Sequence, residues 1–203
     1  MRSLAKFISF VFHPLFVGVM MAAYLIFVHP LYFVGFSEKE KMLKLLAVIN
    51  NNVFFPLLVV ALLRALGFNK SVLLKTQKER IVPYLASITF FFWTFYVSKT
   101  LGDPVELRAF LLCAFIAASA SLIINNYMKV SMHAMSAAGL LTFFTLLLFA
   151  DKLDDMVSLL LAVFITGVIC TSRFIASDHK PAEIYVGFIV GVLLQLISWF
   201  IVH

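Results

Sequence analysis

The chain contains 203 residues, of which 63% are hydrophobic and only 13% are charged; the formal net charge is +6 and the mean hydropathy is +1.05. Ordinary soluble domains carry far less apolar sequence than this. The composition therefore excludes a soluble fold and makes lipid the solvent for most of the surface.

The apolar segments are long enough for helices that cross a membrane. A spanning helix needs about 20 mostly apolar residues and satisfies its own backbone hydrogen bonds in lipid. Strands of a transmembrane barrel would alternate apolar with polar residues, whereas residues 140–150 are apolar all round. We predict helices near residues 7–35, 42–66, 82–100, 106–127, 133–150, 155–173 and 183–202. The predicted fold is an all-α transmembrane bundle of about six to seven spans, with residues 1–203 in a single integral membrane domain.

The first predicted span begins like a signal peptide, with Arg2 and Lys6 ahead of an apolar stretch. That stretch runs on to about Phe36 without a small-residue cleavage site, so we interpret it as a membrane span. His13 and Pro14 lie within it near its basic end, and we interpret His13 as a packing or capping residue.

Polar and small residues inside the later spans indicate contacts between helices. Buried amides need hydrogen-bond partners in hydrocarbon, so we expect the cluster of Asn50, Asn51 and Asn52 to bond to a neighbouring helix. Gly187 and Gly191 form a GxxxG pattern in the last span, which predicts a close approach of two helices. The two cysteines lie in apolar segments and are interpreted as buried packing residues.

Alternating spans sort the short, charged connections onto two faces of the bundle. One face receives the N-terminus and residues 67–80, 129–133 and 172–183, and the other receives residues 37–44, 99–108, 151–155 and the C-terminus. The first, which we call the basic face, carries Lys75, Lys78, Arg80, Lys129, Arg173 and Lys180 together with His133 and His179. This face suits anions, although a Lys/Arg excess that sets topology and contacts acidic headgroups would give the same charge pattern.

Residues 172–183 carry side chains at intervals that suit phosphoryl transfer. The guanidinium of Arg173 offers a planar fork for phosphate oxygens. His179 could attack phosphorus if its other ring nitrogen donates to an acceptor, a role open to Glu183 four residues later. His133 begins another helix on the same face, where it could protonate the leaving oxygen as a general acid.

These residues resemble the motifs of the type-2 phosphatidic acid phosphatase superfamily, which includes membrane lipid phosphatases. The third motif of that superfamily is SRxxxxxHxxxD, and this chain reads SRxxxxxHxxxE from Ser172 to Glu183. Its second motif, PSGH, corresponds to Val130-Ser131-Met132-His133, which keeps the serine and the histidine. Its first motif, KxxxxxxRP, corresponds to residues 75–83, where Lys, Arg and Pro occur at altered spacing. The resemblance covers a phosphatase-like core of about residues 70–203.

The resemblance implies a role for each matching residue. His179 would form a phosphohistidine intermediate, oriented by Glu183, and His133 would be the general acid. Phosphate would be held by Arg173, Ser172, Ser131, Lys75 and Arg80, with Lys129 as a substitute cation. The superfamily needs no metal or other cofactor for this reaction, so none is expected here.

Two further predictions concern the surroundings of the site. Asn125 and Asn126 close the fourth predicted span and lie near enough to His133 in the sequence to line the site. No HxxxH or CxxC spacing occurs, so we predict no metal or haem site.

The expected partners are membrane lipids, with an anionic lipid phosphate as substrate and no nucleic acid. We expect a multi-pass protein of an inner or plasma membrane, with the basic face on the periplasmic or lumenal side as the resemblance implies. The alternative function is a carrier or flippase that binds an anionic lipid through the same basic pocket without cleaving it. A helical scaffold that uses neither Arg173 nor His179 is a third interpretation.

Overall fold

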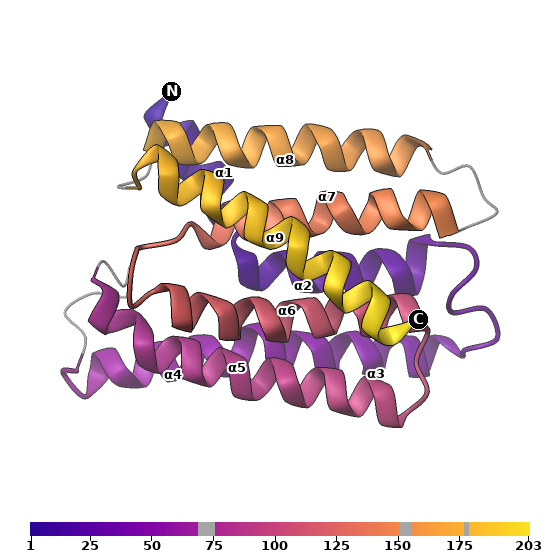
Figure 1. Ribbon diagram of the computed structural model, residues 1–203. Helices are drawn as coiled ribbons and strands as arrows, with labels where there is room; N and C mark the ends of the chain where they lie inside the picture. The colour runs from indigo at the N-terminus through magenta and orange to yellow at the C-terminus, as the bar shows by residue number, and fades with distance from the viewer. Residues whose placement is uncertain (69–75, 151–155, 177–178) are drawn as a thin grey trace.

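The computed structural model describes residues 1–68, 76–150, 156–176 and 179–203, and these residues form helices and no strand (Figure 1). The predicted all-α bundle is confirmed. The elements are α1 (Arg2–Val11), α2 (Pro14–Ala23), the π-helix η1 (Tyr24–Val28), α3 (Glu38–Ile49), the π-helix η2 (Asn50–Phe54), α4 (Phe55–Ala65), α5 (Gln77–Thr100), α6 (Val105–Ile124), α7 (Met132–Ala150), α8 (Met156–Ala176) and α9 (Pro181–Val202).

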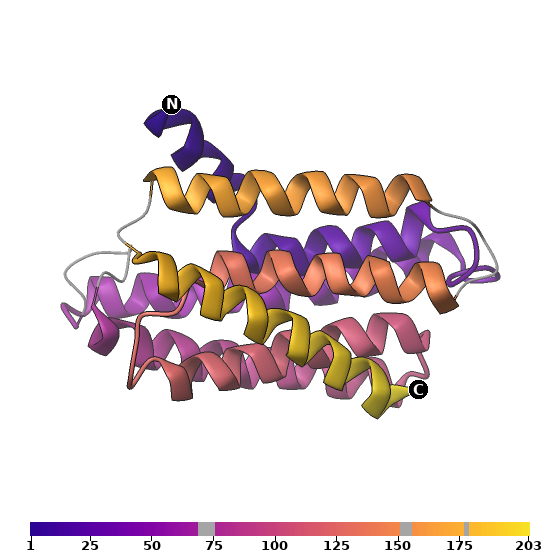
Figure 2. The same ribbon diagram turned by 45° about the horizontal axis from the view of Figure 1, so that its top comes forward.

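Within the described residues, six continuous helical segments are long and apolar enough to cross a membrane, and α1 with α2 would make a seventh span if the bent pair is counted as one. The protein is therefore a multi-pass membrane protein. The helices lie side by side, and α9 crosses the bundle obliquely over α7 and α6 (Figures 1 and 2).

The first span differs from the prediction of one helix near residues 7–35. The structure begins α1 at Arg2 and breaks it from α2 with a bend of 54°. The cause is Pro14, which has no N–H to donate and disfavours a helical conformation at the residue before it. His13 is extended there, and its Nδ1 accepts a hydrogen bond from the N–H of Leu15 at 3.4 Å, which confirms the capping interpretation.

The starts of two helices are fixed by local sequence. Ser37 caps α3 and Thr76 caps α5, and each side chain accepts a bond from the N–H three residues later, while Glu40 and Glu79 accept the N–H of the cap. Such capping boxes satisfy backbone donors that the first turn of a helix leaves unpaired.

The contact between α7 and α9 is built on glycine. A Cβ added to Gly187 would lie 2.6 Å from the Ser131 carbonyl oxygen, and one added to Gly191 would lie 2.2 Å from that of Met135. Only glycine allows the two backbones to approach this closely. The prediction from the GxxxG pattern is confirmed, and the contact brings the start of α9 against the start of α7.

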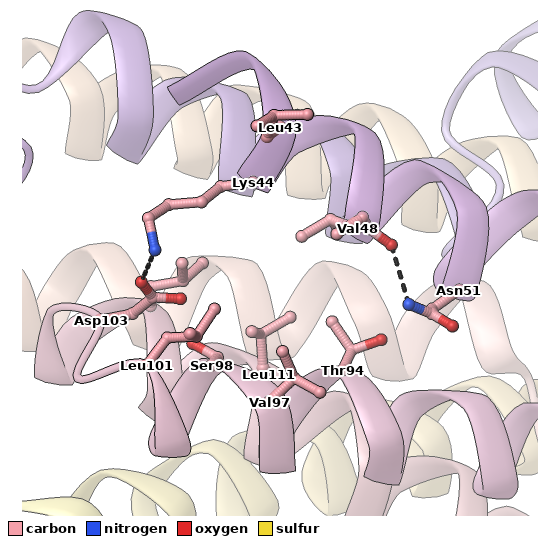
Figure 3. A pocket seen from close by; sticks show the side chains of 12 residues that line it. Leu43, Lys44, Val48, Asn51, Thr94, Val97, Ser98, Leu101, Asp103 and Leu111 are labelled. Carbon is pink, nitrogen blue, oxygen red and sulfur yellow. Dashed lines mark hydrogen bonds and ion pairs between the residues drawn. The ribbon is translucent and has the colours of Figure 1, made fainter. Parts of the chain in front are cut away.

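A cavity of about 150 Å³ lies between α3, α5 and α6 (Figure 3). At one end, the ammonium of Lys44 in α3 pairs with the carboxylate of Asp103. Asp103 lies in the loop between α5 and α6. Nearby, Thr94 donates to Asn52 Oδ1 at 2.9 Å, which confirms the predicted bond to a neighbouring helix for Asn52. Asn51 instead donates to the carbonyl of Ala47 at 3.0 Å, one turn earlier in its own helical segment. This cavity lies toward the bundle end opposite the basic face.

Candidate active site

The candidate nucleophile and its carboxylate partner are in contact. His179 Nδ1 lies 2.9 Å from Glu183 Oε2, and the same oxygen accepts the N–H of Lys180 at 3.2 Å. Pro181 starts α9 and places Glu183 in its first turn, so local sequence holds the carboxylate against the imidazole. With Nδ1 donating to Glu183, the lone pair of the neutral imidazole lies on Nε2.

The electrostatics around His179 favour its neutral form. Burial lowers the pKa of His179 below its ordinary value of 6.5. The hydrogen bond to Glu183 opposes this shift, and the positive charges of Arg173 and Arg80 add to it. The uncharged, nucleophilic imidazole therefore predominates at neutral pH.

The last turn of α8 meets α1 at Ser9. Arg173 Nη1 donates to Ser9 Oγ at 3.1 Å, and Ser9 Oγ lies 3.2 Å from Ser172 Oγ. Ser172 Oγ donates to the carbonyl of Ile169 at 2.7 Å. The proton of Ser9 is consequently directed at Ser172, and its lone pairs face Arg173.

His133, in the first turn of α7, faces the same residue. Its Nε2 lies 2.8 Å from the carbonyl oxygen of Ser9, so Nε2 carries the proton. Its ring is 5.3 Å from the ring of His13, edge to face. Arg173 and His179 both lie within electrostatic reach of His133. The structure thus gathers Arg173, His133 and His179 at one end of the bundle.

Ser131 connects the start of α7, which carries His133, to the start of α9, which follows His179. Its N–H donates to the carbonyl of Glu183 at 3.0 Å, and its Oγ accepts the N–H of Ala134 at 3.4 Å. The side chain is fully buried. Ser131 here caps α7 and holds the start of α9 beside it.

Of the other predicted site residues, Arg80 lies within electrostatic reach of the cluster, whereas Asn125 bonds elsewhere. Arg80 is half-buried near Tyr84 and acts electrostatically on His179, and Lys129 is half-buried before α7. Asn125 donates to the carbonyl of Gln77 at 2.9 Å, tying α6 to α5, while Asn126 is exposed. Lys75 lies outside the described residues.

Ser9 was not among the residues predicted from the sequence, and His13 was predicted only to pack or to cap a helix. Ser9 bonds to residues 124 to 164 positions away, and no motif marks it. The sequence contained one indication of its position. Ser9 lies four residues after Ala5, so the two small residues share one side of a helix near the basic face.

The described residues contain no group of three or more His, Cys, Asp or Glu side chains that could hold a metal ion. No family model, no curated protein and no solved structure matches this chain. The residues and the geometry of the cluster around His179 are therefore what indicates a function.

Proposed function

We propose that the protein is an integral membrane phosphatase that hydrolyses a lipid phosphate monoester or diphosphate through a phosphohistidine. The observation that carries this proposal is the 2.9 Å contact of His179 Nδ1 with Glu183. It fixes the tautomer in which the lone pair of the neutral imidazole lies on Nε2, the arrangement that activated nucleophiles share.

The residues fit the two steps of such a reaction. In the first, the Nε2 lone pair of His179 forms a bond to phosphorus while the P–O ester bond breaks, and protonated His133 gives its proton to the leaving alkoxide. In the second, water attacks the phosphohistidine, His133 takes the water's proton, and the P–N bond breaks to release phosphate. The fork of Arg173 stabilises the negative oxygens in both steps.

The position of the cluster favours a lipid over a soluble phosphate ester. His133 and Glu183 lie in the first turns of α7 and α9, and Arg173 in the last turn of α8. Ends of spanning helices lie at the level of lipid headgroups. We place this end on the periplasmic or lumenal side of an inner or plasma membrane.

The test is phosphate release by detergent-solubilised protein from a panel of lipid phosphates, in chelator and without added metal. We expect His179→Ala to abolish release and Arg173→Ala to lower it about 100-fold or more. The matched controls are His203→Ala on the opposite face and Lys78→Ala, an exposed cation on the basic face, which should retain activity.

A folded wild-type protein that releases no phosphate would contradict the proposal. Binding of lipid phosphate that needs Arg173 but survives His179→Ala would then favour the carrier or flippase. Binding that survives both substitutions would favour the scaffold.

The pH dependence of kcat/KM provides a second prediction. Attack needs neutral His179, and burial lowers the pKa of His179 below 6.5, so on the acid side of the profile activity should fall with decreasing pH through a midpoint below 6.5. On the alkaline side, activity should fall as His133 loses the proton it donates. The hydrogen bond and charge of Glu183 raise the pKa of His179, so Glu183→Gln should move the acid midpoint to lower pH and reduce the maximum. An acid midpoint above 6.5, or one that Glu183→Gln leaves unchanged, would count against His179 as the titrating nucleophile.

A further inference from the structure

One residue of α1 engages three of the predicted site residues, two assigned to phosphate binding and one as the general acid. Ser9 Oγ bonds to Arg173 Nη1 and lies 3.2 Å from Ser172 Oγ, and the Ser9 carbonyl bonds to His133 Nε2. The Ser9 side chain is only 8% exposed. These groups belong to different helices, α7 and α8, and they converge on two oxygen atoms of a single residue.

Two acceptor oxygens close together, facing a guanidinium and an imidazole N–H, reproduce the hydrogen-bonding pattern of two phosphate oxygens. The oxygens of Ser9 are neutral, whereas those of a phosphate are anionic. Arginine forms shorter and stronger hydrogen bonds with anionic than with neutral acceptors. A phosphate that reached this point would therefore compete favourably with Ser9 for Arg173.

The attachment of α1 allows such an exchange. The helix has ten residues, packs on α8 and projects from the bundle in Figure 2. It is joined to α2 at the 54° bend, where Pro14 removes a backbone hydrogen bond that would make the two helices continuous. Ala5 and Ser9 are buried, whereas Leu4, Phe7 and Phe10 are exposed. Such a helix can lie at the membrane surface when it leaves the site.

We infer that α1 covers the phosphate site, with Ser9 in the place of two phosphate oxygens, and that an entering phosphate group displaces it by rotation at His13 and Pro14. This inference rests on the proposed function for the substrate, but its anion-binding step needs no hydrolysis. It makes Ser9 a residue that sets substrate affinity without taking part in the chemistry.

Kinetics provide the first test. Ser9→Ala removes the hydroxyl that competes with phosphate for Arg173, so KM for the lipid phosphate should fall about twofold to tenfold while kcat changes little. Ser3→Ala, an exposed serine on the same helix, is the control and should behave as wild type. A raised KM in Ser9→Ala would mean that Ser9 binds substrate directly and would overturn the inference.

Accessibility provides a test that is independent of turnover. In a Cys170→Ala background, Ser9→Cys is labelled with a thiol reagent in inorganic phosphate and in chloride of equal ionic strength. Phosphate should speed labelling severalfold by displacing α1, and it should do so even if no substrate is hydrolysed. The same experiment in Arg173→Ala should show no acceleration.

The outcomes separate the two proposals. If phosphate accelerates labelling but no phosphate is released from substrate, the proposal that α1 covers an anion site stands and the proposed phosphatase function is wrong. If the protein releases phosphate from substrate but inorganic phosphate slows labelling or leaves it unchanged, the phosphatase function stands and the proposal that α1 covers the site is wrong.

Discussion

Replacement of Gly191 by alanine should push α9 away from α7 and destabilise the bundle. The added Cβ would lie 2.2 Å from the carbonyl oxygen of Met135 and 3.0 Å from Cβ of Ala138. The first neighbour is backbone, so no side-chain rotation relieves the clash. Overpacking of this kind costs about 3 kcal/mol, and more where backbone must move. The measurement is the thermal unfolding midpoint in detergent.

The control for this substitution is Gly167→Ala in α8, where nothing lies within 4 Å of the added Cβ. That variant should be as stable as wild type or slightly more so, because alanine favours a helix. At temperatures where it is still folded, Gly191→Ala should also lose activity, because the start of α9 carries Glu183 and bonds to Ser131. Equal midpoints for the two variants would show that the α7 to α9 contact is not as close as described.

Replacement of Asp103 by alanine should produce a destabilisation of similar size at the other end of the bundle. Asp103 is 5% exposed and pairs with Lys44, which is 14% exposed (Figure 3). Removing one partner of a buried pair leaves the other charge uncompensated and costs about 3 to 5 kcal/mol. Thermal unfolding of Asp103→Ala, Lys44→Met and the double variant gives the coupling between the two residues. The double variant should lose less stability than the sum of the single variants.

The exposed pair of Lys41 and Glu38 is the matched control. Its atoms are 3.0 Å apart, but the Glu38 side chain is 79% exposed. Ion pairs in contact with water contribute about 0 to 1 kcal/mol, so Glu38→Ala should hardly change the unfolding midpoint. Additive effects of Asp103→Ala and Lys44→Met would show that the buried pair does not contribute as a pair. Neither substitution touches the basic face, so the pH profile of any activity should not change.

The sequence by itself determined the features that depend on neighbouring residues. Apolar runs of spanning length predicted the helices from α3 to α9, because hydropathy and helix geometry act within one segment. The contact of His179 with Glu183 was predictable for the same reason, since four residues and a helix start separate the two. The close approach at Gly187 and Gly191 was also visible, because small residues at that spacing mark one side of a helix.

Only the tertiary structure decided which distant residues meet. The N–H of Ser131 bonds to the carbonyl of Glu183, and Asn125 bonds to Gln77, because packing brings these distant segments together. The bend at Pro14 turns α1 onto α8, and this alone places Ser9 between Arg173 and His133. The position of a single hydroxyl in an apolar helix does not identify its hydrogen-bond partner. Its position was set by packing between segments more than a hundred residues apart, which no local pattern encodes.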